Sequence, residues 1–119
     1  MQFNLAVLPG DGIGPDVADE GIKVLQAMDN RFGHNFNLHY GLIGGVAIDE
    51  ERTALSPDTL KMCRGGDAIL LGAVGGPKWD NPQAKVRPED GLLALRKALG
   101  LLPIYARLRS SPCLLIPPT

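Results

Sequence analysis

The sequence has too little cysteine, too balanced a charge and too short apolar runs for several classes of protein. Its two cysteines, Cys63 and Cys113, are too few and too scattered for a disulfide framework or a zinc site. No apolar run approaches the roughly 18 residues that span a bilayer. The formal net charge of -1 gives no sign of a nucleic-acid or membrane-surface partner. Residues 1–4 lack the features of a signal peptide. We therefore expect a cytoplasmic protein.

Apolar runs and glycine turns alternate along the first two thirds of the chain. With 119 residues and 45% apolar content, the chain is one globular domain or a piece of a larger one. Short apolar or alternating runs at 3–8, 36–40 and 68–71 predict three strands. Helical patterns separate them, so the crossovers are long enough for parallel pairing. We therefore predict an α/β protein with parallel strands that are buried on both faces.

Two helix starts are marked by their residues. Pro15 is placed as the first residue of a helix whose apolar side chains would face one way. This stripe comprises Val17, Ile22, Leu25 and Met28. Ser56 before Pro57 is typical of an N-cap and first helical position.

The turn that precedes the first helix contains the glycines Gly10, Gly12 and Gly14. A strand, a glycine turn and a helix together can present backbone N–H groups to an anion. The spacing is G-x-G-x-G, however, and differs from the G-x-G-x-x-G of the Rossmann fingerprint. No acidic residue ends a second strand about 20 residues later. The stretch is therefore a weak dinucleotide-binding motif, and a tight turn without a ligand explains these glycines at least as well.

A long loop and the helix after it, residues 72–97, are the strongest candidate for a binding site. Long ordered loops between regular elements are usually functional. In the helix, Glu89, Leu92, Leu93 and Arg96 share one face by their spacing, whereas Leu92, Leu95 and Leu99 form a core-facing seam. This pattern fits the wall of a pocket, and it also fits a surface helix with a solvated face. Asp11, Asp16 and Asp80 occur singly, so the residues predict no metal site.

Four motifs in order resemble the β-decarboxylating dehydrogenases and, among them, the 3-isopropylmalate dehydrogenases of leucine biosynthesis. They are LPGDGIGP at 8–15, GGVAID at 44–49, LGAVGGPKWD at 71–80 and RPEDGLLALRK at 87–97. The resemblance implies the incomplete N-terminal part of that α/β, non-Rossmann fold over residues 1–101. It also implies NAD, a divalent Mg²⁺ or Mn²⁺ in the full-length enzyme, and a homodimer. Enzymes of this family oxidise the hydroxyl of 3-isopropylmalate and release its β-carboxyl as carbon dioxide, giving 2-oxoisocaproate.

The resemblance also implies roles for single residues. Leu92 and Leu93 match residues that enclose the isopropyl group of the substrate, and Arg96 matches an arginine that binds a substrate carboxylate. The residues expected at the cofactor, beside its nicotinamide end, are Ile13, Gly75, Gly76, Pro77, Lys78, Trp79, Asp80 and Glu89.

The resemblance is expected to end at Leu101. The family continues Phe-Ala-Asn-Leu-Arg-Pro, whose arginine also binds the substrate, whereas Ala106 stands in that place here. One back-translation of residues 102–112, shifted by one nucleotide, restores the family's continuation. We therefore expect a frameshift that leaves an irregular, disordered tail at 102–119. The metal-binding aspartates and the catalytic lysine and tyrosine lie further along in the family, so we expect this chain to be inactive.

Two other readings remain open. A sister dehydrogenase that acts on isocitrate, homoisocitrate or tartrate would need a more polar residue at position 92 or 93 than the leucines found there. A small, non-catalytic nucleotide-binding module would bind NAD without turnover.

Overall fold

Three parallel strands form the centre of the molecule in the computed structural model, which describes residues 1–101. They are β1 (Gln2–Gly10), β2 (Asn35–Tyr40) and β3 (Ala68–Ala73), in the order β2-β1-β3. Leu5 of β1, for example, pairs with Leu38 on one side and Ala68 on the other. The predicted α/β fold with parallel strands is confirmed. The tail predicted at 102–119 lies outside the described residues.

The central strand β1 is buried on both faces, as expected. Ala6 and Leu8 belong to one core cluster, and Val7 belongs to a second cluster on the opposite side. Strands β2 and β3 are only partly buried, however, so the prediction that all strands are buried on both faces is wrong for them. The reason is their place in the sheet: within residues 1–101, each has a neighbouring strand on one side alone.

Helix α1 (Gly14–Phe32) covers one face of the sheet, and Pro15 lies in its first turn as predicted. Its predicted apolar stripe is wrong in part. Ile22 is buried, but Val17 is 49% exposed and Met28 is 41% exposed. The buried line is instead Gly14, Ala18 and Ile22, at i, i+4 and i+8. Small residues face the sheet because the helix lies close to it: a Cβ on Gly14 would overlap the carbonyl oxygen of Pro9.

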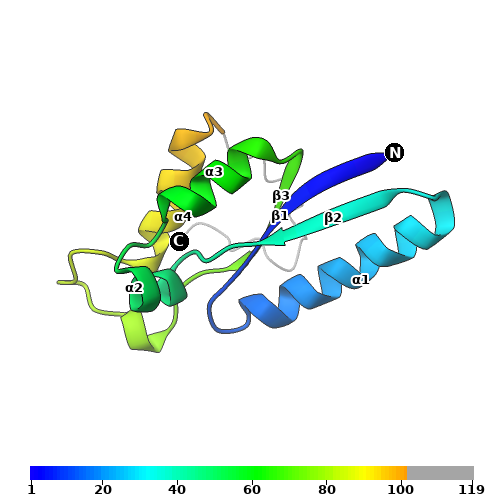
Figure 1. Cartoon of the computed structure of the whole chain (residues 1–119). Helices are drawn as coiled ribbons and strands as arrows, with labels where there is room; N and C mark the ends of the chain where they lie inside the picture. The colour runs from blue at the N-terminus through cyan, green and yellow to red at the C-terminus, as the bar shows by residue number, and fades with distance from the viewer. Residues whose placement is uncertain (102–119) are drawn as a thin grey trace, which may run out of the picture.

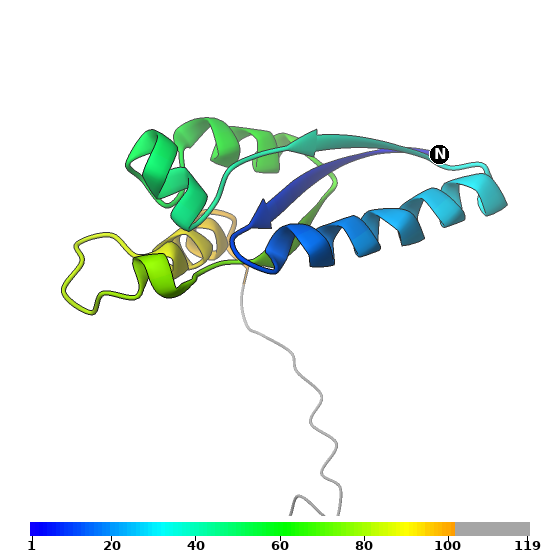
Figure 2. The same cartoon turned by 90° about the horizontal axis from the view of Figure 1, so that it is seen from below.

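The other helices lie on the opposite side of the sheet. Figure 2 shows α2 (Gly45–Glu51) and α3 (Pro57–Gly65) across the strands from α1. Helix α4 (Pro88–Ala98) contributes Leu95 to a core cluster with Cys63 of α3, and Leu99 packs against it. The Ser56 hydroxyl accepts a hydrogen bond from the Thr59 N–H at 3.2 Å, which confirms the predicted N-cap. None of the helices described is both long and apolar enough to cross a bilayer.

Candidate functional site

The three strands end at the same edge of the sheet, and the loops that follow them meet there. From β1 the chain crosses to β2 on one side and then to β3 on the other, so the direction of the crossovers reverses between β1 and β3. In open α/β sheets, ligands bind outside the carboxyl ends of the strands at such a reversal. The loop after β1 and the loop from Val74 to Arg87 therefore frame the candidate site.

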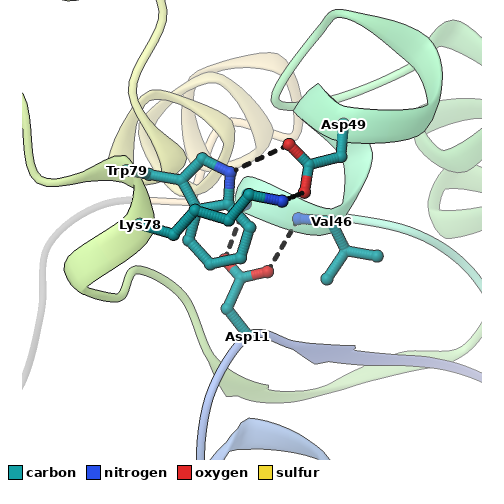
Figure 3. A network of polar contacts seen from close by, with 6 residues as sticks. Asp11, Val46, Asp49, Lys78 and Trp79 are labelled. Carbon is teal, nitrogen blue, oxygen red and sulfur yellow. Dashed lines mark hydrogen bonds and ion pairs between the residues drawn. The ribbon is translucent and has the colours of Figure 1, made fainter.

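The buried carboxylate of Asp11 holds these loops together. It accepts hydrogen bonds from three backbone N–H groups: Gly45 to Oδ2 at 2.6 Å, Gly75 to Oδ2 at 3.0 Å, and Val46 to Oδ1 at 2.8 Å. Figure 3 shows Asp11 below the start of α2, bonded to Val46. The side chain is 2% exposed, so its charge is satisfied by protein groups. Asp11 is thus a structural anchor of the site, a role that the sequence analysis missed.

A cavity of about 360 Å³ lies between the loop after β3 and the start of α4. It is lined by Val74, Gly75, Gly76, Pro77, Trp79, Asp80, Pro88 and Glu89. Six of the eight predicted cofactor residues therefore line one cavity: Gly75, Gly76, Pro77, Trp79, Asp80 and Glu89. We call this cavity the loop pocket. Gly75 lies in the left-handed region, with φ of +101°, and Glu89 Oε1 would lie 3.1 Å from a Cβ there.

The two other predicted cofactor residues, Ile13 and Lys78, lie outside the lining of the loop pocket. Ile13 caps the start of α1 and is 67% exposed. Its neighbour Gly12 lies beside the pocket loop, since a Cβ on Gly12 would stand 3.6 Å from the Gly75 oxygen. The structure thus brings the first glycine turn next to the pocket, without placing the Ile13 side chain in it.

Lys78 instead binds Asp49 of α2. The Lys78 ammonium lies 2.6 Å from Asp49 Oδ2, and the Trp79 indole N–H donates to Oδ1 at 3.2 Å (Figure 3). The same ammonium lies 5.3 Å from the centre of the indole ring. The hydrogen bond from Lys78, followed by that from Trp79, holds the pKa of Asp49 below its ordinary value of 3.8. We call these three side chains the Asp49 clamp.

The ion pair between Lys78 and Asp49 is expected to open in acid. Because the pKa of Asp49 is lower in the folded chain, the stabilisation is fully present above the unfolded value of 3.8 and is lost as the pH falls through the folded value. Trp79 is the one tryptophan of the chain, so its fluorescence reports the change. Protonation leaves an oxygen of Asp49 that can still accept from the indole, but it releases the Lys78 ammonium from its place near the ring. We therefore expect the intensity of Trp79 emission, and not its wavelength, to change with a midpoint below pH 3.8, with far-UV circular dichroism recorded in parallel. Asp49→Asn should abolish this transition, and its persistence in that variant would assign it to another group.

The predicted substrate residues lie on the outward face of α4, next to the loop pocket. The helix buries Pro88, Gly91 and Leu95, which leaves Leu93 62% exposed and Leu92 and Arg96 partly exposed. Within residues 1–101, Arg96 forms no ion pair. Glu89 begins this face and reaches the pocket, but Leu92, Leu93 and Arg96 are absent from its lining. Their role at a substrate stays a prediction.

Two other cavities of the described chain are not candidates for the predicted cofactor or substrate site. An apolar groove of about 660 Å³ lies between α1 and β3, and a hollow of about 440 Å³ lies beside α3, but neither contains a predicted site residue. No group of three or more histidine, cysteine, aspartate or glutamate side chains in the part of the chain that the structure describes could hold a metal ion.

Comparisons with known proteins agree on one family. The sequence profile of the isocitrate/isopropylmalate dehydrogenases matches residues 4–118, which extends past Leu101, where the resemblance was expected to end. The chain is 56% identical to a 3-isopropylmalate dehydrogenase of Dehalococcoides mccartyi over 96% of its own length and 31% of the relative. It is 57% identical to that of Geobacillus kaustophilus over 94% of its own length and 29% of the relative. The chain thus spans about 30% of the length of these curated relatives.

A solved structure gives the same result for the fold. The β-decarboxylating dehydrogenase from Thermococcus kodakarensis superposes with a TM-score of 0.63 at 35% identity. The match covers 83% of this chain and 27% of that one. The predicted fold class, an incomplete part of a β-decarboxylating dehydrogenase fold, is confirmed.

Proposed function

The chain belongs to the isocitrate/isopropylmalate dehydrogenase family, and we propose that it is an N-terminal fragment of an NAD-dependent 3-isopropylmalate dehydrogenase. The complete enzyme would oxidise the hydroxyl of 3-isopropylmalate and release carbon dioxide, in the cytoplasm and as a homodimer. The observation that carries this proposal is the loop pocket, which collects six residues that the family motifs nominate for the cofactor.

The loop pocket is suited to the nicotinamide end of NAD. The cofactor supplies the hydride acceptor, and the protein's task is to bind and orient it. Trp79 and Pro77 offer apolar surface, whereas Asp80 and Glu89 place carboxylates at the same cavity. A carboxylate can accept hydrogen bonds from ribose hydroxyls. The residues present thus combine the apolar wall and the few polar groups that small-molecule sites require.

The outward face of α4 is suited to a branched dicarboxylate. Leu92 and Leu93 would pack against the isopropyl group, and the guanidinium of Arg96 would bind a carboxylate through paired hydrogen bonds. A sister dehydrogenase acting on isocitrate, homoisocitrate or tartrate would place a more polar substrate group against the two leucines. We therefore favour 3-isopropylmalate as the substrate.

The chain alone is proposed to be inactive. In the complete enzyme, Mg²⁺ or Mn²⁺ would stabilise the negative charge that develops on decarboxylation. Residues 1–101 contain no group of three or more histidine, cysteine, aspartate or glutamate side chains that could hold such an ion. Sequencing the gene beyond the codon for Thr119 in all frames tests the proposed frameshift. A frame that resumes with the family's metal-binding aspartates supports it, and its absence favours a non-catalytic nucleotide-binding module.

A chimera tests the proposed substrate. Residues 1–101 of this chain would replace the matching part of the Dehalococcoides mccartyi relative, and NADH formation would be followed with 3-isopropylmalate and with isocitrate. We expect turnover of the first substrate only.

Arg96→Lys in this chimera keeps the charge but loses the paired hydrogen bonds, so kcat/KM for 3-isopropylmalate should fall by about 10- to 100-fold. Lys97→Arg, on the next residue of α4, is the matched control and should leave kcat/KM unchanged. A chimera that prefers isocitrate, or an unchanged Arg96→Lys, would contradict the proposal.

A further inference from the structure

We propose that Asp49 is a positioning residue for the loop pocket, because its carboxylate fixes the indole of Trp79 in the pocket wall. The inference rests on the proposed function of that pocket as a cofactor site. Asp49 lies on α2, outside the pocket lining, and its two partners lie on the 3-10 turn η1 (Pro77–Trp79). It would act on the cofactor only through Trp79.

The indole of Trp79 is held by two restraints of different kinds. One is packing: a Cβ on Gly45 would lie 2.6 Å from Cε3 of the ring and still closer to Cδ2 and Cε2, so the ring rests directly on the start of α2. The other is the hydrogen bond from Nε1 to Asp49 Oδ1 at 3.2 Å. Both restraints act on the side-chain torsions of Trp79: the packing limits movement of the ring toward α2, and the hydrogen bond limits its movement away from Asp49. Together they decide which edge of the indole faces the cavity.

The loop that carries Trp79 makes few other hydrogen bonds to the rest of the described chain. The backbone N–H groups of Trp79, Asp80 and Ala84 donate to carbonyl groups three positions earlier in the same loop. Among residues 1–101, the hydrogen bonds from 74–87 to distant elements are those of Gly75 to Asp11 and of Lys78 and Trp79 to Asp49. Asp11 restrains the beginning of the loop, so the position of Trp79 depends on Asp49.

The charged groups of the Asp49 clamp orient the Trp79 side chain more than they stabilise the folded chain. The side chains of Lys78 and Asp49 are 67% and 39% exposed, and ion pairs this exposed contribute little to folding. The ammonium of Lys78 nevertheless balances the carboxylate while lying near the indole ring. Loss of Asp49 would therefore free the Lys78 ammonium and the indole N–H of Trp79 from α2, while the packing of the ring on Gly45 and the fold stay in place.

The experiment compares Asp49→Ala, Asp49→Asn and the control Glu50→Ala in the whole chain. Glu50 is the exposed acidic neighbour on α2, so its removal changes the charge equally. Two measurements are made: Trp79 emission with acrylamide quenching in the absence of ligand, and NAD⁺ affinity by calorimetry. For Asp49→Ala we expect red-shifted emission, stronger quenching and about tenfold weaker binding, as for one lost hydrogen bond. Asp49→Asn keeps an acceptor for the indole, so it should resemble the parent, as should Glu50→Ala.

The two measurements separate this inference from the proposed function. If the parent chain fails to bind NAD⁺, the proposed cofactor site is wrong. The emission and quenching measurements would still test whether Asp49 restrains the indole of Trp79. If Asp49→Ala leaves both fluorescence readouts at the parent's values, the inference is overturned. If Asp49→Ala fails to fold by circular dichroism, a red shift in Asp49→Asn equal to that of unfolded chain would overturn it too, because the amide should rescue the indole.

Discussion

Replacement of Asp11 by alanine is expected to cause the largest loss of stability of any single substitution at the site. Asp11 is 2% exposed, and its carboxylate accepts three backbone hydrogen bonds, from Gly45, Val46 and Gly75. Hydrogen bonds to charged groups contribute about 1.5 to 3 kcal/mol each, and buried donors left without a partner cost a similar amount. The free energy of unfolding should therefore fall by about 3 to 5 kcal/mol, a large part of the total for a small domain.

Urea unfolding monitored by circular dichroism measures this effect. Asp11→Asn retains one acceptor oxygen but turns an amide N–H₂ toward a backbone donor, so its loss should be about half as large. Asp19→Ala removes the same charge from an exposed position of α1 and serves as the control, with an expected change within about 0.5 kcal/mol. An Asp11→Ala variant as stable as Asp19→Ala would show that the carboxylate does not anchor the loops.

The sequence predicts the regular elements well because their signals are local. The apolar run before Pro9 and the N-cap at Ser56 each depend on neighbouring residues, and the structure contains both. The seam predicted on α4 is confirmed at Leu95 and Leu99, which pack in a core cluster, whereas Leu92 lies partly exposed on the outward face. The buried face of α1 is predicted wrongly because close approach to the sheet selects small residues there. A prediction from hydrophobic periodicity selects large apolar side chains, so it misses the buried residues Gly14 and Ala18.

The residues of the candidate site also fall into two groups: those that a local motif predicts and those that only the fold reveals. The loop pocket is largely built from one continuous stretch, residues 74–80, closed by Pro88 and Glu89, so a motif can nominate most of its lining. Asp11 and Asp49 cannot be recognised by spacing. Asp11 bonds to residues 34, 35 and 64 positions away, and Asp49 bonds to residues 29 and 30 positions away. Their roles follow only from the fold, which brings the ends of β1 and β3 to the start of α2.

Gly45→Ala is expected to displace Trp79 and to change the loop pocket more than its single added methyl suggests. Three carbons of the indole lie within 2.6 Å of the place where a Cβ would stand. The rigid ring cannot bend, so either the indole leaves α2 or the start of α2 moves away from Asp11. Overpacking of this kind costs about 1 to 3 kcal/mol. We expect that loss in urea unfolding, together with red-shifted Trp79 emission and weaker NAD⁺ binding.

The matched control is Gly65→Ala at the end of α3. Nothing lies within 4 Å of a Cβ at that position and its φ is not positive, so the substitution should be neutral or slightly stabilising. Equal effects of Gly45→Ala and Gly65→Ala would mean that the indole does not rest on α2. A change in Trp79 emission with Gly45→Ala alone would show that contact with the start of the helix keeps the ring in the wall.

Combining Gly45→Ala with Asp49→Ala shows whether packing and hydrogen bonding act on the same state of the ring. If the added methyl displaces the indole, its N–H no longer reaches Asp49, and removing that carboxylate as well should change emission and NAD⁺ affinity little further. Residues that share a partner are coupled in this way, whereas independent sites give additive effects. Additive losses would mean that Asp49 acts through Lys78 without the indole. A second substitution without further effect would mean that the start of α2, through Gly45 and Asp49 together, sets the position of one wall of the loop pocket.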